Sequence, residues 1–131
     1  MNKQVEDRIK AASGESGRLP CVTAHQIADS LGVSPAEVGA AADELGTRIW
    51  ACQMGLFGYG KKPLPEYKLV RPAQSVPDEV ESELQGALVN GQLPCAAAWA
   101  IADRHGLSYL EVSNDAEALG LKISPCQLGC F

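Results

Sequence analysis

The sequence predicts a mainly α-helical fold with small strands, in which two copies of one unit form a pseudo-twofold pair. Residues 17–57 align with residues 91–131 at a constant offset of 74, and 20 of the 41 aligned positions are identical without a gap. Because the unit occurs only twice, a closed pair is expected rather than a solenoid. The composition is 46% hydrophobic but only 5% aromatic, which favours closely packed helices over an aromatic-rich sheet.

The first unit begins with two predicted helices. One is expected near residues 3–12. Thr23 followed by Gln26 matches a capping box and predicts the start of the next helix. Ile27 and Leu31 follow at helical spacing, and Gly32 is a typical residue just beyond a helix end.

A third helix is predicted directly after this glycine. Ser34 is a preferred N-cap, with Pro35 at the first helical position and Glu37 three residues after the cap. The apolar residues that follow lie at i, i+4 and i+7, and another glycine ends the pattern. The turn between the two helices is therefore about three residues long, which is the spacing of a helix-turn-helix. The apolar residues are Val38, Ala42 and Leu45, and the final glycine is Gly46.

The second unit repeats this pattern after a helix expected near residues 77–88. Ser108 and Glu111 again form a predicted capping box, and short strands are expected at residues 48–52 and 122–126 before Gly-rich tails. Ile27 and Ile101 are expected to be buried in matching environments, as are Val38 and Val112. An Ile27→Ala substitution is then expected to cost about 2 to 5 kcal/mol.

The stretch IADSLGVSPAEVGAAADELG resembles the winged-helix and helix-turn-helix superfamily, and the resemblance extends over both copies. It implies tandem winged-helix units with small β wings. It also implies DNA binding through the second helix of each helix-turn-helix. The expected organisation is a first unit at residues 1–58, a connector at 59–76 and a second unit at 77–131.

The charge is unevenly distributed along the chain. The first unit has five Lys/Arg against seven Asp/Glu, the connector has four against one, and the second unit has two against eight. The net charges are therefore −2, +3 and −6. An acidic second unit is expected to repel a phosphate backbone, whereas the connector is expected to attract it.

The predicted recognition helices lack the side chains that read bases. Arg, Lys, Asn and Gln match base edges, but the outward positions of the first unit are small or acidic. In the second unit only Asn114 offers such a side chain, and two carboxylates lie beside it. Glu37 and Glu111 are explained by helix capping. Such a smooth face suits close packing against the sister repeat or a partner chain. The candidate partner-contacting residues are Ala36, Gly39, Ala40, Asp43, Leu110, Ser113 and Asn114.

Basic residues lie instead around the expected first wing and in the connector. A wing contacts phosphate without reading sequence, so weak DNA binding by the first half is one hypothesis, and a solvated linker is the alternative. The candidate nucleic-acid-binding residues are Arg18, Arg48, Lys61, Lys62, Lys68 and Arg71.

Four of the five cysteines are repeat partners, Cys21 with Cys95 and Cys52 with Cys126. They are expected to be reduced and free of metal, as small buried hydrophobic residues. The winged-helix resemblance implies that the segment before the motif pairs with the strand after it, which places Cys21 opposite Cys52 and Cys95 opposite Cys126. The spacing matches metal-binding motifs poorly, and neither His25 nor His105 recurs in the other copy. Cys126 and Cys130, near the chain end, are the redox candidates.

The sequence offers no set of nucleophile, base and orienting residue, so neither a catalytic site nor a cofactor is predicted. It also has no apolar run long enough to span a bilayer and no apolar signal segment, which predicts a cytoplasmic location without a membrane partner. The leading hypothesis is a non-enzymatic regulator-like module that acts through DNA, bound by the first unit's wing and the connector, or through a DNA-bound partner. The alternatives are a protein-interaction module, with a protein partner or as a homodimer, and a thiol or metal sensor.

Overall fold

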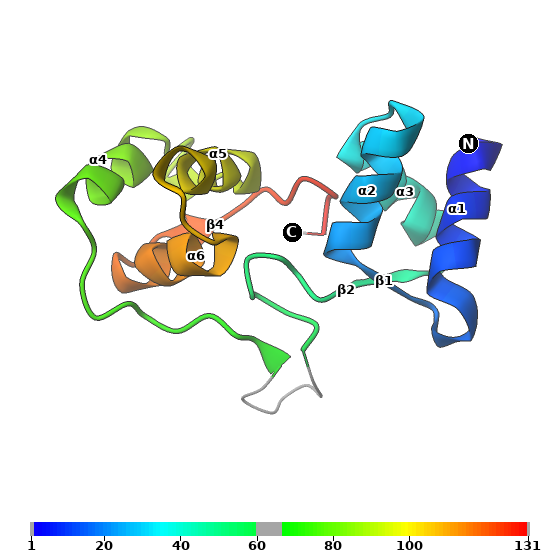
Figure 1. The fold of residues 1–131 in the computed structure, drawn as a ribbon, viewed down its shortest axis with the longest axis horizontal. Coiled ribbons are helices and arrows are strands. Elements are labelled where there is room, and N and C mark those ends of the chain that lie inside the picture. The colour runs from blue at the N-terminus through cyan, green and yellow to red at the C-terminus, as the bar shows by residue number, and fades with distance from the viewer. Residues whose placement is uncertain (1, 60–66, 131) are drawn as a thin grey trace.

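The computed structural model describes residues 2–59 and 67–130 and is mainly helical, with two helical lobes (Figure 1). The first half holds α1–α3 with β1 and β2, and the second half holds α4–α6 with β3 and β4. Among the described residues, no helix combines the length and hydropathy needed to cross a membrane. The helices are α1 (Lys3–Ser13), α2 (Cys21–Leu31), α3 (Pro35–Glu44), α4 (Asp78–Gly86), α5 (Cys95–His105) and α6 (Tyr109–Ala118).

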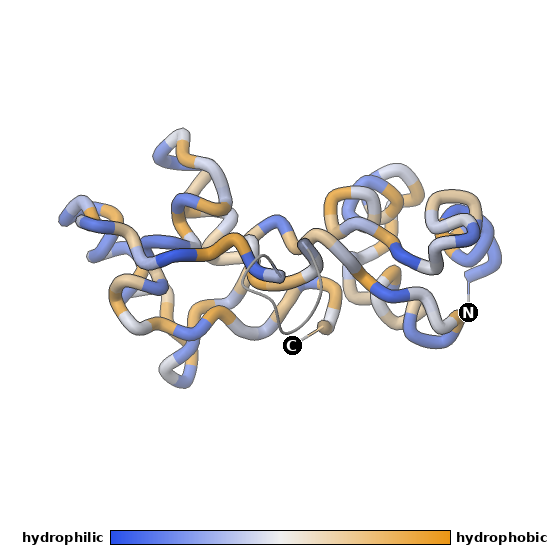
Figure 2. Tube along the Cα trace, turned by 90° about the horizontal axis from the view of Figure 1, so that it is seen from below, coloured by the Kyte–Doolittle hydropathy of each residue, from blue (hydrophilic) through white to orange (hydrophobic). Residues whose placement is uncertain are grey.

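The helices confirm the repeat that the sequence predicts. The bounds of α5 and α6 are those of α2 and α3 shifted by 74 residues. Ile27, Val38, Ile101 and Val112 are all buried. Hydrophobic and hydrophilic residues alternate along the helices of both lobes, as in amphipathic helices that cover a core (Figure 2).

The helix ends follow local chemistry with one exception. Ser34 and Ser108 cap α3 and α6, and only Ser108 belongs to a complete, reciprocal capping box. The predicted capping box at Thr23 is wrong, because α2 already begins at Cys21 and has Pro20 at its N-cap. Thr23 is aligned with Ala97, whose side chain cannot cap a helix. Helices α2 and α5 therefore both begin at a cysteine, without a hydrogen bond from a capping side chain.

Each half contains one short pair of parallel strands. β1 (Arg18–Pro20) pairs with β2 (Arg48–Trp50), and β3 (Gln92–Leu93) pairs with β4 (Lys122–Ile123). The strand after the helix-turn-helix therefore pairs with the segment before it. Among the described residues no antiparallel strand follows β2 or β4, so the described tails do not form the hairpin of a wing.

The tails that follow β2 and β4 cross to the opposite half. The first tail, residues 51–59, places Cys52 and Met54 in the core of the second half. The second tail, residues 124–130, places Leu128 in the core of the first half. Figure 1 shows this exchange, with the chain leaving β2 towards α6 and the chain leaving β4 towards α2 and α3. Met54 and Leu128 are repeat partners, so the exchange is reciprocal.

The exchange explains why α3 contains a glycine. A Cβ placed on Gly39 would lie 2.7 Å from the carbonyl carbon of Leu128, so the second tail crosses α3 at this residue. Its repeat partner Ser113 is also buried, on the helix that the first tail approaches. A Cβ at Gly55 in the first tail would likewise meet Leu110 of α6 at 2.6 Å.

The two halves also meet through a pair of repeat partners. The rings of His25 on α2 and Trp99 on α5 lie 4.4 Å apart, and Trp99 stacks on Tyr109 at 4.3 Å. Trp99 packs against the cores of both halves. Contact between equivalent residues places the pseudo-twofold axis between α2 and α5.

Candidate functional site: a four-cysteine centre between the halves

The four repeat-related cysteines gather where the exchanged tails meet the helix starts. Cys21 and Cys95 are the first residues of α2 and α5, whereas Cys52 and Cys126 lie in the first and second tails. Cys21, Cys52 and Cys95 are buried, with 6%, 5% and 5% of their surface exposed, and Cys126 is half-buried. We call these four residues the four-cysteine centre; each is a free thiol.

Electrostatics shows that the four thiols share one environment. Burial is the main cause that raises the pKa of Cys21 to about 12, and the nearby Cys52, Cys126 and Cys95 contribute to the same rise. Burial likewise raises the pKa of Cys95 to about 11, with contributions from Cys126 and Cys52. The pKa of Cys52 is also raised, chiefly by burial. Each of these thiols therefore resists ionisation, partly because the others are near.

Backbone amides donate to the four sulfurs in the same pattern in both halves. The amide of Gln53 donates to Cys21, and the amide of its repeat partner Gln127 donates to Cys95. The amides two, three and four residues later in each tail lower the pKa of Cys52 and of Cys126. The Leu128 amide lies 3.4 Å from the Cys126 sulfur, and Gln127 Nε2 lies 3.6 Å from the Cys95 sulfur. The Gly-containing tails thus wrap around these sulfurs.

The redox candidates Cys126 and Cys130 are in contact. The Cys130 thiol donates a hydrogen bond to Cys126, which lowers the pKa of Cys126 and raises that of Cys130. Cys130 is exposed, and its repeat partner is Leu56. Cys130 therefore stands at the edge of the four-cysteine centre and outside its symmetry.

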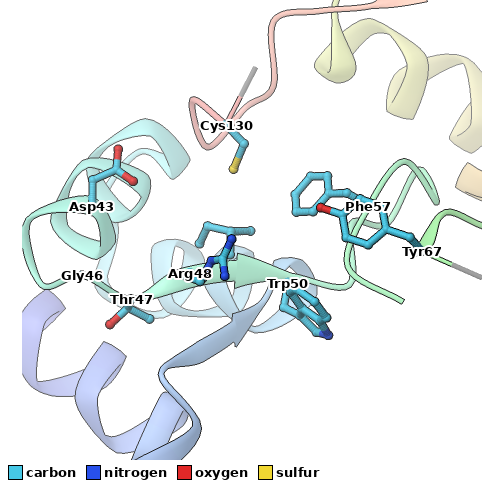
Figure 3. A pocket seen from close by; sticks show the side chains of 9 residues that line it. Asp43, Gly46, Thr47, Arg48, Trp50, Phe57, Tyr67 and Cys130 are labelled. Carbon is cyan, nitrogen blue, oxygen red and sulfur yellow. The ribbon is translucent and has the colours of Figure 1, made fainter. Parts of the chain in front are cut away.

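A pocket of about 580 Å³ opens beside Cys130 in the first half. Figure 3 shows the Cys130 sulfur directed into the space bounded by Asp43, Arg48 and Phe57. Trp50 and Tyr67 line the pocket as well, with their rings 6.3 Å apart in an edge-on arrangement. Cys130 lines this pocket, whereas the four residues of the centre do not.

The structure describes four of the six predicted nucleic-acid-binding residues. Strand pairing sets Arg18 beside Arg48, both exposed, and the Arg18 guanidinium lies 4.2 Å from the centre of the Trp50 ring. Lys68 is exposed, while the Arg71 side chain donates to the carbonyls of Lys68 and Val70. Lys61 and Lys62 lie outside the described residues.

The predicted partner-contacting residues fall into two groups. Gly39, Leu110 and Ser113 face the exchanged tails, and Asn114 accepts a hydrogen bond from the Arg71 amide at 2.8 Å. Their contacts are with the chain's own segments. On α3, the exposed members of the set are Ala36, Ala40 and Asp43.

His105 and the capping glutamates Glu37 and Glu111 are engaged at helix ends or in an ion pair. His105 pairs with Glu83, which also binds Arg104 at 2.6 Å. Glu37 and Glu111 lie at the starts of α3 and α6. Among the described residues, no three His, Cys, Asp or Glu side chains are arranged to share a single metal ion.

The alignment of the two copies identifies the paired cysteines but does not show that all four lie close together in space. The missed signal is the tail motif Cys-Gln-x-Gly-x-Phe, which both copies keep in a segment without regular secondary structure. Comparisons of the chain with protein-family models, curated proteins and solved structures give no match.

Proposed function

We propose that the protein is a non-enzymatic regulatory module whose two helix-turn-helix halves are coupled through the thiols of the four-cysteine centre. The observation that carries this proposal is that four repeat-related cysteines meet where each tail enters the opposite half. A change in the chemical state of these thiols acts directly on the tail segments that join the halves. Coupling of a local chemical event to a packed interface is a common basis for regulation.

The faces of α3 and α6 favour this proposal over reading of DNA by a recognition helix. Gly39 and Ser113 are buried where the tails cross, so these sides of the helices are not free to enter a major groove. The exposed positions of α3 include Glu37 and Asp43, whose charges oppose a phosphate backbone. A regulator of this kind acts through a protein partner or through sequence-independent contacts.

Hydrogen exchange of the full chain tests the coupling. We expect residues 51–59 and 124–130 to lose protection when the buried thiols are alkylated under mild denaturation and the protein is refolded. The same treatment of a variant with serine at the four positions of the centre controls for reagent effects. Equal protection of both tails in native and alkylated protein would reduce the centre to a structural role.

Sequence-independent DNA binding through the first half is a second candidate. The observation that favours it is the exposed Arg18–Arg48 pair on β1 and β2, next to the basic connector. Each phosphate contact contributes roughly −0.9 to the slope of log K against log salt, so Arg18→Ala with Arg48→Ala is expected to flatten it by about two units. Lys10→Ala on the exposed face of α1 is the matched control. An absence of binding by the unmodified chain at low salt would exclude this candidate.

A further inference from the structure

The four-cysteine centre has the features of a ligand set. A cysteine that acts only as a small apolar residue is exchangeable for another apolar residue, and Leu56 aligned with Cys130 shows such an exchange in this chain. The four residues of the centre are instead cysteine in both copies. They come from four separate segments, yet Cys52 packs in one buried cluster with Cys95, Cys126 packs against the cluster that holds Cys21, and Gln127, next to Cys126, donates to the Cys95 sulfur.

The surroundings of the sulfurs supply hydrogen bonds rather than opposite charge. The Leu128 amide lies 3.4 Å from the Cys126 sulfur, and Gln127 Nε2 lies 3.6 Å from the Cys95 sulfur. Cys21 and Cys95 also lie in the first turns of α2 and α5, where the helix dipole favours an anion. Donors and helix starts of this kind suit anionic sulfur ligands around a cationic group.

The arrangement does not suit one mononuclear metal ion. Four sulfurs bound to one zinc ion converge at about 2.3 Å from it, and no group of three such ligands among the described residues meets that demand. In a [4Fe–4S] cluster each cysteine binds a different iron, so the four sulfurs stand farther apart around a larger core. Hydrogen bonds from backbone amides to the sulfurs are a usual feature of such clusters and tune their reduction potential.

We infer that the four-cysteine centre binds an iron–sulfur cluster of the [4Fe–4S] class through Cys21, Cys52, Cys95 and Cys126. The cluster is held by one cysteine at each helix start and one in each exchanged tail, so it binds all four segments that meet between the halves. Each thiol releases its proton when it binds iron. This inference rests on the proposed function, because it names the group through which the halves are coupled.

Anaerobic reconstitution of the full chain with equal amounts of ferric and ferrous iron and with sulfide tests the inference, since this mixture supplies the mixed-valence core without a further oxidant. We expect about four irons and four acid-labile sulfides per chain, with visible sulfur-to-iron charge-transfer absorption. Mass spectrometry after alkylation of the native, reconstituted protein gives a readout that needs no variant. Cys21, Cys52, Cys95 and Cys126 should be protected from the reagent, while Cys130 reacts.

Single serine variants then assign the ligands. Cys21→Ser, Cys52→Ser, Cys95→Ser and Cys126→Ser are each expected to lower the iron content by at least half, with far-UV circular dichroism as the check on folding. Cys130→Ser is the matched control and should keep the full content, because the repeat partner of Cys130 is Leu56 and the two copies do not share a cysteine at this position. An equal loss of iron in Cys130→Ser would overturn the ligand assignment.

Other results distinguish failure of the cluster site from failure of the proposed coupling function. A chain that binds no iron and sulfide, or that instead binds one zinc ion, overturns the cluster. The proposed function then still stands if alkylation of the centre loosens the tails in hydrogen exchange. If the cluster binds but neither its binding nor alkylation changes tail protection, the coupling function is wrong and the cluster site stands.

Discussion

The two halves of the chain have the same helical core but receive the opposite tail in different ways. Six helix positions carry identical residues and are buried in both copies: Cys21/Cys95, Ala24/Ala98, Ile27/Ile101, Ala28/Ala102, Val38/Val112 and Ala42/Ala116. By contrast, the helix position under the tail is Gly39 in the first half and Ser113 in the second. The buried core of the helical unit is therefore the same in both halves, whereas the residues that contact the incoming tail differ between them.

The largest effect is expected from the side chains that each tail places in the other half. Met54 and Leu128 are both buried, so Met54→Ala and Leu128→Ala should each lower the free energy of unfolding by about 2 to 5 kcal/mol. Chemical denaturation followed by circular dichroism measures the change. Leu69→Ala, which truncates an exposed connector residue, is the control and should change it by less than about 1 kcal/mol. Losses as small as this for both tail variants would show that the exchange adds little stability.

Alanine substitutions at the aligned positions Gly39 and Ser113 are expected to change stability by a smaller amount and in opposite directions. Gly39→Ala adds a Cβ where the Leu128 backbone passes, so it should destabilise by about 1 to 3 kcal/mol, although Gly→Ala usually stabilises a helix. Ser113→Ala removes a buried hydroxyl without a hydrogen-bond partner, so it should be neutral or stabilise by about 1 kcal/mol. Thermal unfolding of both variants checks this difference. Stabilisation by Gly39→Ala would contradict the close approach of the second tail.

The smallest effect concerns the aromatic pair on the pseudo-twofold axis. Burial lowers the pKa of His25 below its ordinary value of 6.5, so the unfolded chain takes up this proton more readily than the folded chain. Stability should therefore fall as the pH drops below about 6.5. His25→Phe should reduce this pH dependence, which denaturation midpoints measured from pH 8 to pH 5 would show. An identical pH dependence in the variant would assign it to other groups.

Much of the fold could be predicted because its signals are local. Ser34 and Ser108 cap helices and Gly32 ends one, and each needs only its neighbours in the chain. The start of α2 was missed because it depends on Pro20 at the end of a strand pair rather than on a side-chain cap. The tail exchange could not be predicted from local patterns, because the few apolar residues of each tail do not specify which core they enter.

The candidate site was predictable only in part. The alignment identified the four paired cysteines, but their convergence depends on the tail exchange, which brings distant segments together. The sequence predicts that each tail cysteine lies opposite the helix cysteine of its own half, but in the structure each tail cysteine also packs in the opposite half. The Cys52 side chain enters the core around Cys95, and Cys126 packs against the core around Cys21.

Residue-resolved hydrogen exchange of Leu128→Ala tests the exchange of tails between the halves, because Leu128 belongs to the second tail but packs in the core of the first half. The account predicts faster exchange in α1, α2 and α3, with α4, α5 and α6 close to the unmodified protein. Faster exchange confined to α4, α5 and α6 would contradict the exchange of tails between the halves.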